Sequence, residues 1–177
     1  MYFKGAFIFS LFASALAAPI TSGDQKVKRG ILSVQDYSQF QISDGVAGNA
    51  LAEVQAKFPI DESDLASVDD EDLAIIKAAR ETAEAAETDA GGFNEAIEAA
   101  GGKKTTKGKA LQVGKIKNKV LKLQLQVLAL KIDAAKGKDT AEKLAAEQKK
   151  LDKNVATDKA SAGQTSQSVN FQGTSQP

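Results

Sequence analysis

The feature that most constrains the fold is an apolar pattern that begins within residues 107–132, KGKALQVGKIKNKVLKLQLQVLALKI, and continues to Ala134. Seven residues recur at alternating intervals of three and four: Val113, Ile116, Val120, Leu123, Val127, Leu130 and Ala134. This is the spacing of one helix face and of a coiled-coil heptad. A strand is the alternative, because apolar and polar residues alternate from Leu121 to Val127, but that alternation reverses its phase at Leu128. We therefore predict a long helix.

A second apolar stripe runs along the same predicted helix and consists of Leu121, Leu125, Leu128 and Ile132. The two stripes are about 140° apart, so two sets of neighbours are needed to cover them. A helix lying on a membrane surface would show a single broad apolar face. Lys117, Gln124 and Lys131 lie between the stripes, and we expect their long stems to reach outward to solvent. The pattern predicts the central helix of a bundle.

Two further helices and one short helix are predicted before this segment. The first spans about 45–58, with Ser43 or Asp44 as its N-cap and Pro59 at its end. The second spans about 67–90, with acidic residues 69–72 in its first turn and glycines after its last turn. A brief helix follows at 93–100.

The last predicted helix spans about 140–160 and forms an αα-hairpin with the lysine-rich helix. Gly137 is expected to be a left-handed C-terminal cap, and Asp139 and Glu142 resemble a capping box. Residues 161–177, SAGQTSQSVNFQGTSQP, are poor in apolar side chains and are predicted to be a disordered tail. The predicted fold class is all-α, a bundle of about four long helices and one short helix, with a disordered N-terminal leader and C-terminal tail.

The N-terminus has the pattern of a secretory signal peptide spanning residues 1–17. Lys4 precedes an apolar run, and the small-x-small triplet ending at Ala17 predicts cleavage after that residue. A membrane anchor is the alternative, but it needs roughly 20 apolar residues and this run is shorter. We expect a secreted, extracellular protein.

A second cleavage is suggested by the dibasic pair Lys28 and Arg29, which suits a subtilisin-like processing protease of the secretory pathway. The alternative is two surface cations on a flexible leader, and the sequence leaves both open. Residues 18–29 would be a pro-segment or leader, and residues 30–160 a single helical domain.

Composition excludes several chemistries. The chain has no cysteine and no histidine, which removes disulfides, the usual zinc ligands and the Ser-His-Asp and Cys-His nucleophile systems. We therefore expect no catalytic, cofactor-binding or metal-binding residues and no cofactor. After Arg29 the chain holds 19 basic and 22 acidic residues, a net charge of −3, so no nucleic-acid partner is expected.

Charge is divided along the chain. Residues 53–98 hold 14 acidic and three basic residues, whereas residues 103–153 hold 15 lysines and five acidic residues. This division favours acidic helices packed beside basic helices in one bundle. A basic patch for an anionic glycan, lipid or nucleic acid is the alternative.

Three stretches carry a family resemblance: QISDGVAGNALAEVQAKFP, ETAEAAETDAGGFNEAIEAAGG and GKIKNKVLKLQLQVLALKI. Together with the signal peptide and the dibasic pair, they resemble a group of small secreted proteins of filamentous ascomycete fungi. The resemblance covers most of residues 38–155. It implies an uncharacterised secreted protein of candidate-effector type and no catalytic residues.

Three functional hypotheses follow from the sequence. The favoured one is a secreted non-enzymatic interaction protein, such as an effector or a cell-surface protein, whose partner is an unknown protein or a cell-wall or host component. The alternative is a lipid- or surface-binding amphipathic helical protein. The third is an enzyme with paired carboxylates, although DDED at 69–72 is better explained as a first helical turn. We expect a monomer without stable membrane insertion.

Overall fold

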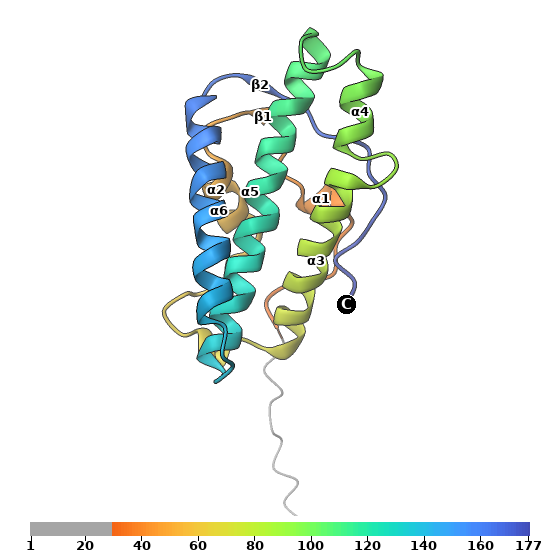
Figure 1. Cartoon of the computed structure of the whole chain (residues 1–177). Helices are drawn as coiled ribbons and strands as arrows, with labels where there is room; N and C mark the ends of the chain where they lie inside the picture. The colour runs from red at the N-terminus through yellow and green to blue at the C-terminus, as the bar shows by residue number, and fades with distance from the viewer. Residues whose placement is uncertain (1–29) are drawn as a thin grey trace, which may run out of the picture.

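A computed structural model describes residues 30–177 and shows a helical bundle built around helix α5, Thr106–Ala135 (Figure 1). The helices α3, Asp70–Thr88, and α6, Ala141–Ala160, lie along α5 on different sides. Shorter helices complete the bundle: α1, Tyr37–Phe40; α2, Ala50–Lys57; the 3₁₀ helix η1, Leu65–Ser67; and α4, Phe93–Ala99. The predicted all-α class is confirmed. The predicted leader lies outside the described residues.

The middle of helix α5 is buried on both apolar stripes, which confirms its central position. In the first stripe, Val113 and Ile116 near the start are half-buried and Ala134 at the end is exposed. Leu121, Leu125 and Ile132 of the second stripe are fully covered, and Val120 and Val127 of the first stripe are equally enclosed. Burial of a side chain of this size contributes about 1.5–3 kcal/mol to the free energy of unfolding. Helix α5 is therefore the element around which the rest of the core is assembled.

Helix α3 packs against α5 through small side chains. Its buried face includes Ala79, Ala83 and Ala86, all without exposed surface. Small residues let two helix backbones approach closely. Asp69 is the N-cap, with its side chain accepting a hydrogen bond from the Glu71 amide at 2.8 Å. The prediction that residues 69–72 form the first turn of a helix is confirmed to within one residue.

Helix α2 is shorter than predicted, and the proposed N-cap at Ser43 or Asp44 is wrong. The helix begins at Ala50, and the preceding residues contain strand β1, Gly45–Val46. Gly45 and Gly48 have φ values of 87° and 119°, a region that disfavours residues with a side chain. The chain therefore turns twice here before it can enter a helix.

The connection between α5 and α6 follows part of the prediction. Gly137 adopts φ 90°, and its amide and that of Lys138 donate to carbonyls of the last turn of α5, as in a helix C-cap. The capping box at Asp139 is wrong, because Thr140 occupies the N-cap of α6 without a side-chain cap.

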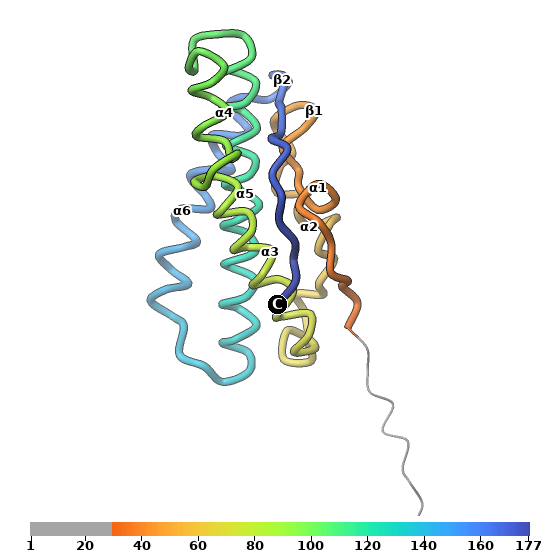
Figure 2. Tube along the Cα trace, turned by 90° about the vertical axis from the view of Figure 1, so that its right-hand side faces the viewer, coloured from red at the N-terminus to blue at the C-terminus, as the bar shows by residue number. Residues whose placement is uncertain are grey.

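The prediction of a disordered tail at 161–177 is also wrong. Strand β2, Thr165–Ser166, pairs antiparallel with β1, and the remaining residues run back along the bundle beside the N-terminal segment (Figure 2). The Gln167 amide donates to the Ala110 carbonyl, and the Ser175 amide donates to the Gln35 carbonyl. Backbone hydrogen bonds to existing elements thus order a segment whose own side chains supply little apolar area.

Candidate functional site

The sequence-predicted processing residues Ala17, Lys28 and Arg29 lie outside the described residues. The first described residue, Gly30, directly follows the dibasic pair. Because the predicted cut after Arg29 would make Gly30 the new N-terminus, the candidate site is the region that contacts Gly30 and the two residues after it.

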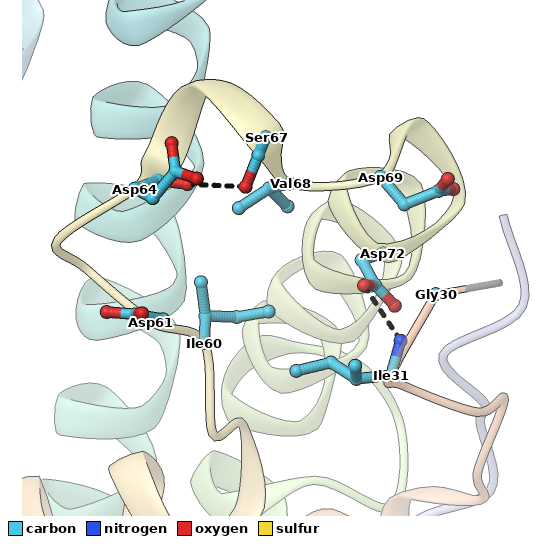
Figure 3. Close-up of a pocket in the computed structure, with 9 residues that line it drawn as sticks. All are labelled: Gly30, Ile31, Ile60, Asp61, Asp64, Ser67, Val68, Asp69 and Asp72. Atoms are coloured by element: carbon cyan, nitrogen blue, oxygen red, sulfur yellow. Dashed lines mark hydrogen bonds between the residues drawn. The ribbon is translucent and has the colours of Figure 1, made fainter. Parts of the chain in front are cut away.

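The side chain of Asp72 in α3 binds backbone amides of this segment. One carboxylate oxygen accepts the Ile31 amide at 3.0 Å (Figure 3). The other accepts the Leu32 amide at 2.8 Å. Asp72 is only 3% exposed. It lies in the first turn of α3, where the helix dipole favours a negative charge.

Gly30 itself lies against the same carboxylate. A Cβ built on Gly30 would overlap Oδ1 of Asp72 and would lie 2.8 Å from its Cγ. Any residue with a side chain would have to displace Asp72 or the segment that Asp72 holds. The contact places the Gly30 Cα directly beside a buried carboxylate.

A pocket of about 230 Å³ opens beside this contact. Its lining combines Gly30 and Ile31 with the aspartates Asp61, Asp64, Asp69 and Asp72, and no lysine or arginine of residues 30–177 belongs to it. This part of the lining is therefore negatively charged at neutral pH.

Most of these aspartates already have local partners. Asp69 caps α3, and Asp61 accepts hydrogen bonds from the Ser63 amide and hydroxyl, which hold the pKa of Asp61 below its usual value. Asp70, the next residue of the DDED motif, forms an ion pair with Lys136 that lowers the Asp70 pKa. These contacts stabilise turns and helix ends, which is the role predicted for DDED.

A second polar centre surrounds Lys117, which was expected to reach solvent. That expectation is wrong: Lys117 is 1% exposed, and its Nζ lies 2.9 Å from the Glu53 carboxylate. It also donates to the carbonyl oxygens of Asp44 and Val46 at 3.0 and 3.1 Å. The turns that precede α2 supply these carbonyls, and the helical periodicity of α5 gave no indication of them.

Next to Lys117, Asn118 links three helices. The buried Tyr37 hydroxyl donates to Asn118 Oδ1 at 2.8 Å, and Asn118 Nδ2 donates to the Ala83 carbonyl at 2.7 Å. Burial raises the pKa of Tyr37 to about 12. A phenol that stays protonated serves here as a fixed hydrogen-bond donor.

A third polar centre surrounds Glu87 of α3, which contacts several lysines of α5. It lies 3.1 Å from both Lys119 and Lys122 and 3.7 Å from Lys115. Burial opposes ionisation of Glu87, but the hydrogen bonds and charges of Lys122 and Lys119 hold its pKa below the usual value. The predicted packing of acidic against basic helices is confirmed at this contact.

Within residues 30–177, no group of three or more carboxylates is arranged to hold a metal ion. None of the helices described there is long and apolar enough to cross a membrane.

Comparison with known proteins yields one match. A family model described as Domain of unknown function (DUF8454) matches residues 32–170. No curated protein and no solved structure matches the chain. The matched region begins just after Gly30 and extends into the ordered tail.

Proposed function

This chain belongs to the DUF8454 family, and we propose that it is a secreted protein that binds a protein or a cell-surface component and catalyses no reaction. The observation that carries the proposal is that three buried charged side chains are bound by other groups of the fold. Asp72, Lys117 and Glu87 are each held by hydrogen bonds or ion pairs within the fold. Such groups position backbone and helices and are not free to act on a substrate.

A catalytic carboxylate pair would need two acids facing a common space, one with a raised pKa. The pKa values of Asp61 and Asp70 are instead lowered by their partners. Asp64 is the aspartate of the pocket whose carboxylate forms no hydrogen bond to another described residue. A single exposed carboxylate does not supply both an acid and a base.

Secretion and a role as a fungal effector or cell-surface protein are further parts of the proposal. They rest on the signal-peptide pattern of residues 1–17 and on the resemblance to small secreted fungal proteins. The partner class proposed is a protein or a cell-wall or host component.

The alternative, a lipid- or surface-binding protein, is favoured by one observation. Four exposed lysines, none in an ion pair among residues 30–177, surround the turn between α4 and α5: Lys103, Lys104, Lys107 and Lys109. Lipid insertion would need an apolar face as well, and the apolar side chains of α5 from Val120 to Ile132 are buried. This cluster therefore supports electrostatic contact with an anionic surface at most.

The test begins with protein secreted from the full-length gene. Intact mass is expected to show a chain that starts at Gly30, or at Ala18 if the dibasic pair is not cut; a chain retaining Met1 would contradict secretion. The secreted chain is then assayed for saturable binding to cell walls and intact cells and for turnover of polysaccharide, ester and peptide substrates. Binding without turnover is expected. Turnover that disappears in Asp64→Asn would replace the proposal with an enzyme.

Charge reversal separates the two binding classes. Lys103→Glu with Lys104→Glu is compared with Lys153→Glu, an exposed lysine of α6 distant in sequence from the cluster. Loss of binding to anionic liposomes at about 0.15 M salt in the first variant only would favour the alternative.

A further inference from the structure

We propose that Asp72 is the receptor for a new N-terminus: cleavage after Arg29 turns Gly30 into a terminal ammonium group that binds the Asp72 carboxylate. The inference goes beyond the proposed function, since it concerns maturation of the fold and names no external partner.

The segment that begins at Gly30 is already fixed to Asp72. Asp72 already accepts the amides of Ile31 and Leu32, so the chain immediately after the cleavage point is fixed to it by two hydrogen bonds. The Gly30 Cα lies against Oδ1, close enough that no Cβ fits between them. The nitrogen of Gly30 is one bond, about 1.46 Å, from that Cα. Once freed, it needs only a rotation within Gly30 to approach the carboxylate.

Within residues 30–177, the Asp72 carboxylate has no cationic partner. Asp72 is 3% exposed, and no lysine or arginine of residues 30–177 forms an ion pair with it. A buried carboxylate is ordinarily paired with a cation, because two neutral amides compensate only part of its lost hydration. Lys136 forms its ion pair with Asp70.

Among residues 30–177, the titratable groups that line the pocket with Gly30 are all aspartates: Asp61, Asp64, Asp69 and Asp72. A positive charge placed at Gly30 is therefore attracted by the whole lining and repelled by none of it. The uncut chain has a neutral peptide group at the same position. Cleavage converts this peptide group into a cation beside a buried anion.

The chemical step is hydrolysis of the Arg29–Gly30 peptide bond. A processing protease specific for dibasic pairs adds water across the C–N bond, which leaves a carboxylate on Arg29 and an ammonium group on Gly30 at neutral pH. Ile31 is 62% exposed, so the chain next to the bond lies at the surface.

The experiment compares cut and uncut protein. Secretion from a host that lacks a dibasic processing protease yields the chain beginning at Ala18, and part of it is then cut in vitro with a purified subtilisin-like dibasic protease. Cleavage is expected to raise Tm by about 3–6 °C at pH 6.5. The rise should vanish near pH 10, because an ammonium stabilised by folding loses its contribution as pH rises through its folded pKa.

Two variants test the assignment to Asp72. In Asp72→Asn the side chain keeps its shape and one acceptor oxygen, and cleavage should no longer raise Tm. Insertion of one glycine between Arg29 and Gly30 leaves Asp72 intact but moves the new ammonium one residue away, about 3.8 Å along the chain, and most of the rise should disappear.

Reactivity of the new terminus gives a readout that does not depend on the variants folding. At pH 7, the Gly30 amine of the cut wild-type chain should react with 2-pyridinecarboxaldehyde at least about tenfold more slowly than the unfolded chain, which corresponds to about 1.4 kcal/mol. Equal Tm for cut and uncut protein, or an equal rise in the glycine-insertion variant, would overturn the proposal. Neither result depends on a binding partner, so failure here leaves the proposed function untouched. Absence of the cut in natural secreted protein would also overturn it.

Discussion

Lys117 and Glu53 form an ion pair in which the lysine is almost wholly buried, with 2.9 Å between its Nζ and the carboxylate. The glutamate remains partly exposed, so the pair lies at the edge of the core. The same lysine donates to the Asp44 and Val46 carbonyls and so holds strand β1 and the residue before it. Strand β1 in turn pairs with β2 of the C-terminal tail. One side chain thus joins α5, α2 and β1.

Replacement of Lys117 by methionine should lower the free energy of unfolding by about 2–4 kcal/mol, because two backbone carbonyls lose their donor and Glu53 loses its cation. Chemical denaturation monitored by circular dichroism measures the change. Lys153→Met, the same substitution on the exposed face of α6, should change it by no more than about 0.5 kcal/mol. Equal effects would mean that Lys117 is not buried in solution.

Gly114→Ala should release the C-terminal tail. A Cβ on Gly114 would overlap the Gln167 carbonyl oxygen and lie 3.1 Å from that of Ser43. Although alanine favours a helix by up to about 1 kcal/mol over glycine, we expect a net loss of about 1–3 kcal/mol. Hydrogen exchange should show faster exchange of the Gln167 and Ser175 amides, with α3 amides unchanged. A stabilised variant with a protected tail would contradict this packing.

Glu87 should contribute to acid sensitivity. Its pKa is lower in the folded than in the unfolded protein, so its contribution is complete above the unfolded pKa of about 4.3 and is lost as pH falls through the folded pKa. Glu87→Gln should cost about 1–3 kcal/mol at pH 7 and less at pH 3. Glu81→Gln, an exposed acid of the same helix, is the control and should cost at most about 0.5 kcal/mol. A constant cost of Glu87→Gln across this range would exclude an ion-pair role.

Leu128→Asp should unfold the protein or cost several kcal/mol, because Leu128 is 3% exposed and the new charge would have no partner. Thermal denaturation measures the effect.

The wild-type protein should remain in the soluble fraction on flotation with anionic liposomes at about 0.15 M salt. A folded Leu128→Asp variant that has lost wild-type flotation would instead place this face at a lipid surface.

Much of the fold was predictable because the apolar periodicity of α5 indicates which of its faces other helices must cover. Two apolar stripes on one helix require neighbours on two sides, whatever those neighbours are. The division of charge indicated which helix lies beside α5, and Glu87 with Lys119 and Lys122 confirms it. The family resemblance to secreted fungal proteins remains a prediction.

The sequence by itself determined the helical class, the central helix and the dibasic pair before Gly30, since these depend on local spacing and residue type. Tertiary structure alone decided that Lys117 is buried, that the polar tail is ordered and that Asp72 receives residues 30–32. The physical reason is that each of these depends on backbone amides or carbonyls from distant segments. Backbone groups are identical at nearly every residue, so periodicity and composition carry no record of which of them will meet a given side chain.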